Sequence, residues 1–328
     1  YDRKRPRTIF TGRYLKLVKD STSFDFFARG RLWLGISGVM VIVAFGSFLV
    51  QGLNYGIDFR GGIVVEVRTD GPADFAAMRS ALTGLDLGDV ALQEFGAPNE
   101  VLIRVESQDG KPGGQEAAVE ALRNMLTAQF AGADIRRVES VGAEVSDELF
   151  IDGVTALLFA FVAMLVYIWF RFEWQFAVAA VGTLVLDALI GVGFFAVTNI
   201  PFNLSSVAAL LTIIGYSIND KVVVFDRVRE NLRKYKSMPL IDLLDKSVND
   251  TLTRTIATSL TTFIAIAPLA IIGGESVAGF AMAMMFGVVV GTLSSIFVAA
   301  PLVHMMGDEQ LRRGVQKEAE PEAGGARP

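Results

Sequence analysis

The sequence predicts a polytopic α-helical membrane protein with six transmembrane helices and one external α+β domain. Three observations predict this fold class. The 328 residues are 52% hydrophobic, and the apolar residues gather in six runs of about 20, the length that spans a bilayer as a helix. A long polar segment with strand and helix patterns separates the first run from the second. Lys and Arg concentrate in a few connecting segments, as they do in membrane proteins.

The chain begins with a basic segment, residues 1–31, which holds nine Lys and Arg residues. The first apolar run, 32–52, is too long for the apolar core of a cleavable signal peptide. We therefore expect a cytoplasmic N-terminal segment followed by a first transmembrane helix.

Residues 53–149 form the expected external domain. Alternating and β-branched runs predict strands at 63–68, 90–95, 101–105 and 135–141. Amphipathic runs predict helices at 74–85, with Asp74 as its cap, and at 115–130. The resulting order, βαββαβ, matches the ferredoxin-like fold.

The other five transmembrane helices are expected within 150–305. Their apolar runs cover 150–170, 175–197, 204–225, 255–273 and 279–304. A basic segment, 227–250, lies between the runs 204–225 and 255–273 and is expected to form two surface helices broken at Met238 and Pro239. The apolar side of these helices is expected to face the membrane or a neighbour, and it consists of Ile241, Leu244 and Val248. The charged tail, 306–328, is expected to be disordered in the cytoplasm.

The distribution of Lys and Arg sets the orientation. Segment 227–250 holds six of them and the turn 171–174 holds Arg171, whereas the loops 198–203 and 273–278 hold none. The positive-inside rule therefore places both termini, the turn and 227–250 in the cytoplasm, and the domain 53–149 outside. Because the basic residues follow this membrane pattern, we expect no nucleic-acid partner.

Just past the first span, a seven-residue motif is rich in glycine. Its residues are Gly56, Ile57, Asp58, Phe59, Arg60, Gly61 and Gly62. Three glycines in seven residues indicate a tight backbone where the chain leaves the membrane and enters the first strand. We expect a mainly structural role, although a turn alone does not explain the choice of Asp58 and Phe59.

The fourth span carries an acid near its middle. Asp220 ends a run whose other members include Gly215, Tyr216, Ser217 and Asn219. Ionised carboxylates are costly in hydrocarbon, and those retained there usually serve an ion or substrate path. At 3.6 residues per turn, Tyr216, Ser217 and Asp220 share a face. We expect a functional acid; the alternative is that the helix ends before it.

Three further charged residues belong to the membrane region. Arg254 opens the fifth span beside a row of hydroxyls, which suits a hydrated cavity or an Asp–Arg pair, or only bonding between helices. Asp187, in the third span, either joins the same cavity or is a structural polar link. Asp226 lies near the cytoplasmic boundary. Lys221 is expected to extend towards the cytoplasm.

Small residues form a row on the sixth span, and we expect a packing face without chemistry. The row consists of Ala283, Gly287, Gly291 and Ser295.

Several function classes are disfavoured. The chain has no Cys and a single His, His304, so a zinc or haem site would lack ligands, and we expect no metal and no cofactor. An intramembrane hydrolase would need a nucleophile with a base or metal set, so we expect no enzyme. A self-contained transporter would show two repeats, but only one six-span unit is present. A second half is therefore expected from another chain.

At these residues the chain resembles the SecF family, subunits of the bacterial SecD–SecF accessory complex of the Sec translocon and part of the RND superfamily. The similarity covers roughly 30–305 and includes the motifs 56–62, 170–174, 215–220, 223–231 and 253–255. It implies that the six spans are one RND-type half. It also implies a proton pathway, with the acid on Asp220 and its arginine partner on Arg254, to which Asp187 and Asp226 are added as neighbouring acids. Lys221 departs from the family pattern, in which a small or hydroxylated residue often follows the acid; a cation there favours the ionised form of the acid.

The resemblance implies a protein translocase subunit in the bacterial inner membrane. With a SecD-like six-span subunit it would use the proton-motive force to help export unfolded polypeptides delivered through SecYEG. Its expected partners are this subunit, SecYEG, the translocating polypeptide, protons and membrane lipid. The alternative is an RND-type proton-coupled exporter of lipid or another small hydrophobic substrate, which a long second external domain would have favoured.

Overall fold

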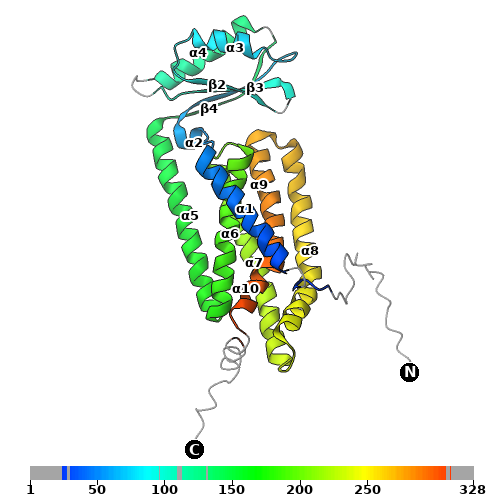
Figure 1. The fold of residues 1–328 in the computed structure, drawn as a ribbon. Coiled ribbons are helices and arrows are strands. Elements are labelled where there is room, and N and C mark those ends of the chain that lie inside the picture. Colours follow the sequence, from blue (N-terminus) through cyan, green and yellow to red (C-terminus); the bar gives the residue numbers. More distant parts are fainter. Residues whose placement is uncertain are drawn as a thin grey trace, which may run out of the picture.

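The computed structural model describes residues 24–27, 30–95, 97–108, 113–130, 132–307 and 311. Most of the predicted N-terminal segment, 1–31, and of the predicted tail, 306–328, lies outside these described residues. A bundle of long helices carries a small α/β domain (62–141) at one end (Figure 1).

Among the described residues, six helical stretches are long and apolar enough to cross a membrane, which confirms the six predicted spans. They are α1 (Gly30–Gln51), α5 (Ala143–Arg171), α6 (Trp174–Thr198), α7 (Leu204–Lys234), α8 (Leu240–Ile272) and a sixth that passes through α9 (Gly274–Ser294), the π-helix η2 (Ser295–Ala299) and α10 (Ala300–Met305).

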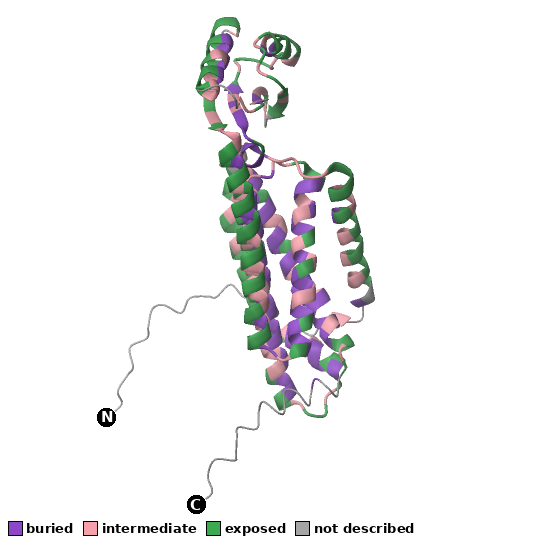
Figure 2. Cartoon of the chain, turned by 90° about the vertical axis from the view of Figure 1, so that its left-hand side faces the viewer, coloured by how far each residue is buried: buried purple, intermediate pink, exposed green. Residues whose placement is uncertain are grey.

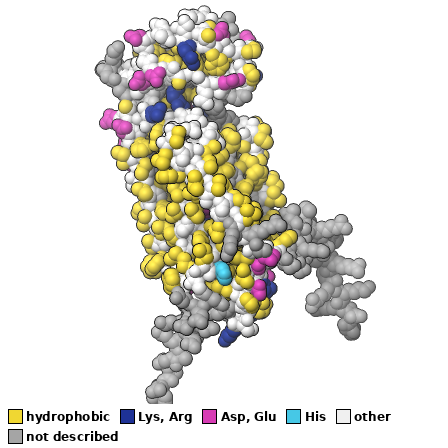
Figure 3. Space-filling model, in the orientation of Figure 1, with side chains coloured by type: hydrophobic (Ala, Val, Ile, Leu, Met, Phe, Trp, Pro, Cys, Tyr) yellow, Lys and Arg dark blue, Asp and Glu magenta, His cyan; other side chains and the backbone are white. Residues whose placement is uncertain are grey.

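Three of the six helices form the inside of the bundle. Half or more of the apolar window is buried in α6, α7 and the sixth helix, but only 6% of it in α1, α5 and α8. Exposed residues follow the length of α5 (Figure 2), and hydrophobic side chains cover the visible face of the bundle, with charges mainly at its two ends (Figure 3). An apolar surface of this extent fits lipid or another membrane helix.

The prediction that segment 227–250 forms two separate surface helices is wrong. The segment continues α7 to Lys234 and begins α8 at Leu240, because hydropathy detects only the apolar part of each helix. Ion pairs connect the charged ends, with Arg227 contacting Asp250 at 2.9 Å and Glu230 at 2.6 Å. α5 likewise begins at Ala143, seven residues before the predicted span.

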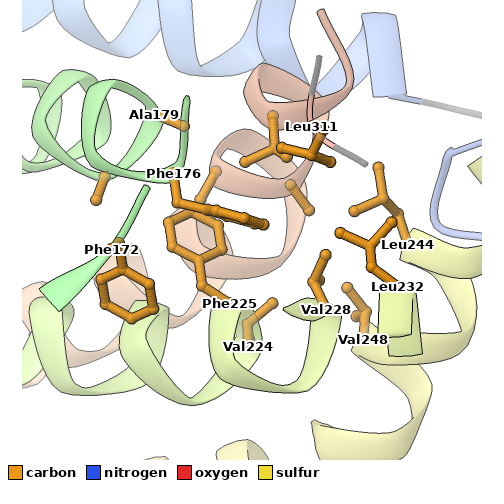
Figure 4. Packing of buried hydrophobic residues seen from close by; sticks show 14 of the residues in the cluster. Phe172, Phe176, Ala179, Val224, Phe225, Val228, Leu232, Leu244, Val248 and Leu311 are labelled. Carbon is orange, nitrogen blue, oxygen red and sulfur yellow. The ribbon is translucent and has the colours of Figure 1, made fainter. Parts of the chain in front are cut away.

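Apolar side chains of this segment pack inside the protein. Leu244 and Val248 are fully buried in one core cluster with Phe176 and Phe225 (Figure 4). They thus face a neighbour, one of the two expected surroundings, whereas Ile241 is 39% exposed.

The α/β domain contains all six predicted elements. They are β1 (Gly62–Arg68), α3 (Phe75–Thr83), β2 (Val90–Phe95), β3 (Ala97–Val105), α4 (Gly114–Gln129) and β4 (Asp134–Val141). Asp74 caps α3 as expected, accepting hydrogen bonds from the Ala76 and Ala77 amides. The strands form one antiparallel sheet in the order β2-β3-β1-β4, and buried side chains of the sheet, α3 and α4 form a single core.

The face of the sheet away from this core borders a pocket of about 220 Å³ at the end of the membrane bundle. Glu66, Arg104 and Arg137 line it on the sheet side, and Pro201 and Asn203 on the bundle side. Partial burial raises the pKa of the Glu66 carboxyl, an effect that the nearby Arg137 guanidinium opposes.

We expect residues 55–148 to fold as a separate soluble fragment, because their core is contained within the domain. Circular dichroism should show one cooperative thermal transition. Replacing the fully buried Leu122 by Ala should lower the midpoint, since such truncations cost about 2–5 kcal/mol. A gradual, non-cooperative loss of signal in the unaltered fragment would show that the domain depends on the membrane bundle.

Candidate membrane-embedded carboxylate site

Asp220 lies well inside α7, 16 residues after Leu204 and 14 before Lys234, so the helix does not end before it. Its side chain is nearly buried, with 5% exposed. Thr255 of α8 donates a hydrogen bond to its Oδ1 at 2.8 Å, and Ser295 of η2 donates to its Oδ2. In the part of the chain that the structure describes, no cation forms an ion pair with this carboxylate.

Asp187 of α6 forms a second buried site with Lys221. The two side chains are fully buried, and the Lys221 Nζ lies 2.6 Å from the Asp187 Oδ2. The expectation that Lys221 extends towards the cytoplasm is therefore wrong, because its ammonium binds a buried carboxylate on the neighbouring helix. No group of three or more His, Cys, Asp or Glu among the described residues is placed to hold a metal ion.

The polar side chains of α7 divide into two neighbouring rows. Tyr216 and Asp220 turn to α8, where the Tyr216 hydroxyl donates to the Ser259 hydroxyl at 2.9 Å. Ser217 and Lys221, four residues apart, turn to Asp187 instead. The expected common face of Tyr216, Ser217 and Asp220 is thus split, because adjacent residues differ by about 100° around a helix and two partner helices compete for them.

Ser294 and Ser295 connect the two acids. Ser294 donates to Asp187 at 2.9 Å, and the next residue, Ser295, donates to Asp220. The π-helix begins at Ser295, and such turns are frequent at functional sites. The sixth span was expected to supply packing only, so the role of Ser295 is a correction; a π-turn leaves no mark in hydropathy.

The small-residue row nevertheless packs as predicted. A Cβ on Gly287 would lie 2.3 Å from the Ile213 side chain, and one on Gly291 would lie 3.1 Å from that of Ser217. This close approach of α9 to α7 brings the serine hydroxyls within reach of the acids.

Arg254 is exposed on α8, and no contact with Asp220 is present among the described residues. The next residue, Thr255, points inward to the acid instead. The predicted hydroxyl row of α8 consists of Thr251, Thr255, Thr258 and Thr262, of which Thr258 is exposed and Thr262 is partly exposed. The arginine therefore lies on the outer surface of α8, within one residue of the acid's hydrogen-bond donor.

Asp226 belongs to an ion network at the end of the bundle away from the α/β domain. Arg171 contacts its carboxylate at 2.8 Å, and Arg229 lies 3.8 Å from it. Arg229 also pairs with Glu173 at 2.9 Å. The network thus joins the turn between α5 and α6 to the charged part of α7.

The glycine-rich motif forms α2 (Ile57–Arg60) and joins the α/β domain to the bundle. Asp58 Oδ2 accepts a hydrogen bond from the first amide of α7, that of Leu204, at 2.9 Å. Phe59 packs against Phe202. These two contacts with the bundle explain why Asp58 and Phe59 stand in the motif. Gly61 and Gly62 have φ values of 71° and 114°, in the region that favours glycine.

The remaining motif residues are less central. Gly56 is buried at the bridge between the chain after α1 and the loop before α7, with its amide donating to the Phe202 carbonyl at 2.8 Å. Gly215 is partly buried, and Asn219 is exposed. Lys221, Ser294 and Ser295 are the site residues that the sequence did not reveal; a lysine inside an apolar span was the available signal for the first.

Comparison with known families finds matches along most of the chain. Residues 121–309 match the model "Protein export membrane protein SecD/SecF, C-terminal", and residues 46–73 match the "SecD/SecF GG Motif". The chain is 46% identical to "Protein translocase subunit SecF" of Rhodobacter capsulatus, over 89% of this chain and 92% of that protein. It is 46% identical to the same subunit of Magnetococcus marinus, over 93% of this chain and 99% of that protein.

Two solved structures are also similar to this chain. The chain is 31% identical to SecDF, a translocon-associated membrane protein from Thermus thermophilus, with a TM-score of 0.79 over 88% of this chain. A SecDF structure in a super-membrane-facing form gives a TM-score of 0.64. The chain spans about two fifths of the length of these solved chains, 39% and 40%. On the family matches and the nearly full-length relatives, the chain belongs to the SecD/SecF family of protein export membrane proteins, and within it to SecF.

Proposed function

We propose that this chain is a protein translocase subunit that, with a SecD-like partner, uses the proton-motive force to help drive or complete export of polypeptides delivered through SecYEG. It lies in the bacterial inner membrane, with both termini in the cytoplasm. The α/β domain is a ferredoxin-like unit on the periplasmic or extracellular side, where it meets the translocating polypeptide. The strand order β2-β3-β1-β4 supports the domain assignment, and the basic residues at the opposite end support the orientation.

The observation that carries the proposal is the buried Asp220. A carboxylate inside a membrane helix, held only by two hydroxyls, lacks the cation that would keep it charged at low cost. It can therefore exchange a proton, with Arg254 on the neighbouring surface as its arginine partner in another conformation. Asp226 lies 6 residues further along α7 and is the next acid of this helix towards the proposed cytoplasmic side.

The hydrogen bonds around Asp220 suggest how protonation acts on the helices. When the acid is charged, Ser295 donates to it; the same hydroxyl lies 2.8 Å from the Thr292 carbonyl of its own helix. A hydroxyl has one proton to donate. Protonated Asp220 can donate to Ser295, which then donates to Thr292, so the link between α7 and η2 changes direction.

The energy available is sufficient for a conformational cycle. One proton crossing about 100 mV supplies about 2.3 kcal/mol, which corresponds to roughly a fifty-fold change in a two-state equilibrium. The α/β domain is connected to α7 through Asp58, which accepts a bond from the α7 amide of Leu204. Movement of α7 can therefore be transmitted to the domain that meets the exported chain.

We expect the chain to purify with a second six-span protein and to be less stable alone. The polar surface of α8, with the exposed Arg254 and Thr258 and the partly exposed Thr262, needs a cover that lipid does not supply. The check is affinity purification from membranes in mild detergent, followed by size analysis of the chain with and without the partner. A monodisperse isolated chain that conducts protons by itself would contradict the two-half arrangement.

The function itself is tested in membrane vesicles that carry SecYEG, with and without the chain and its partner. The rate at which a precursor completes export is measured as the imposed proton-motive force is raised. A force-dependent increase that requires the chain supports the proposal, and an identical dependence without the chain refutes it.

A further inference from the structure

Asp187 is hydrogen-bonded through only one of its two carboxylate oxygens. Its Oδ2 accepts from Lys221 at 2.6 Å, from Ser294 at 2.9 Å and from Ser217. Its Oδ1 is buried and has no hydrogen-bond partner among the described residues. A buried charged oxygen without a donor is costly, so this side of the carboxylate needs a further donor.

A small cavity supplies the space for one. A void of about 50 Å³ lies between α1, α6 and α9, and Asp187 lines it with the hydroxyl residues Ser37, Thr183 and Ser294. One water molecule needs roughly 10–15 Å³ of such volume and two or more polar partners. The cavity meets both conditions, whereas its other walls are apolar.

All three hydrogen-bond donors of the Lys221 ammonium are engaged. Its ammonium contacts Asp187 at 2.6 Å, Ser294 at 3.2 Å and Ser217, which uses the three donors of a lysine. The two serines accept from the lysine and donate to the aspartate, so the four side chains form a closed ring. Asp220, the adjacent residue, receives only hydroxyls.

We infer that Asp187 and Lys221 form a permanently charged ion pair completed by water in the α1–α6–α9 cavity, and that Lys221 is a positioning residue that leaves Asp220 as the single proton-exchanging acid of this chain's membrane region. The last clause rests on the proposed function. The ion pair carries no net charge, so it can remain buried while Asp220 changes its charge.

The other ionisable groups near the pair are few. Tyr216 and Asp220 on α7 face α8, and Arg254 of α8 is exposed. The segments of α1 and α9 that line the cavity contribute hydroxyl and apolar side chains and no ionisable group. Lys221 is therefore the cation that determines the charge of Asp187.

The test is an infrared pH titration of the chain with its partner in liposomes, comparing difference spectra in the region of the protonated carboxyl group. We expect Asp220→Asn to remove one titrating band and the double variant Asp187→Asn/Lys221→Met to leave that band in place. Lys221→Met alone is expected to add a new carboxylic acid band at neutral pH, because the lone Asp187 takes up a proton rather than stay charged. The double variant should lack this new band.

Stability gives an independent measurement if Lys221→Met assembles poorly. Removing one partner of a buried pair leaves the other to be buried as a lone charge or neutralised by protonation, each at a cost in stability, whereas removing both does not. The thermal midpoint of the complex should fall in Lys221→Met and recover in the double variant. The inference is overturned if the wild-type band disappears on removing Asp187, if Lys221→Met adds no band, or if the double variant is as unstable as the single one. Because protonation is read without export, the result stands whether or not Asp220 drives transport.

Discussion

Replacement of Asp220 by Asn is expected to abolish the stimulation of export by the proton-motive force while the chain still assembles with its partner. Asn keeps the shape of the side chain and can still accept from Thr255 or Ser295, but it cannot exchange a proton. The export rate in vesicles should therefore become independent of the imposed force, at the level seen without any force.

Two variants control this experiment. Asp220→Glu retains a carboxylate and should keep part of the force dependence, because the acid is present but displaced by one methylene. Glu230→Gln removes an exposed carboxylate from the same helix, at its ion pair with Arg227, and should keep the full dependence. If Asp220→Asn responds to the force as the wild type does, the acid has a structural role only.

Replacement of Gly62 by Ala is expected to lower the stability of the α/β domain strongly. The residue has a φ of 114°, and a Cβ there would lie 2.4 Å from the Val105 carbonyl oxygen of the paired strand. Strained backbone of this kind costs about 1–3 kcal/mol, and the clash forces the β1–β3 ladder to shift. For a loss of about 3 kcal/mol, the midpoint of the 55–148 fragment should fall by roughly 12–24 °C.

Gly71→Ala is the matched control, because a Cβ at that exposed position meets nothing within 4 Å. The midpoint of this variant should stay close to that of the unaltered fragment. Equal midpoints for Gly62→Ala and Gly71→Ala would show that the motif glycine is not needed for the backbone of the α/β domain.

Local patterns in the sequence were sufficient to predict the helices and strands of the α/β domain and the apolar part of each membrane helix. The alternation in 63–68 and the cap at Asp74 depend on neighbouring residues, so the amino-acid order alone is enough to recognise them. The ends of α7 and α8 could not be recognised in this way, because their charged turns are held by pairs such as Arg227 with Asp250, which join distant parts of the chain.

In the site, too, features that depend on neighbouring residues were predictable, and contacts between different helices were not. Asp220 could be identified from its position inside an apolar run. The partner of Lys221 lies 34 residues away on another helix, and the orientation of Ser294 and Ser295 depends on a π-turn. Arg254, which the family resemblance pairs with Asp220, is on the outer face of α8. Such pairings depend on helix packing and conformation, which a hydropathy pattern does not contain.

The decisive experiment for the role of Asp220 is proton entry into liposomes that contain the chain with its partner, followed by an internal pH dye after a proton-motive force is imposed. We expect acidification with the wild-type complex, none with Asp220→Asn, and none with the isolated chain. Equal proton entry in the wild type and in Asp220→Asn would contradict the proposal that Asp220 carries the proton.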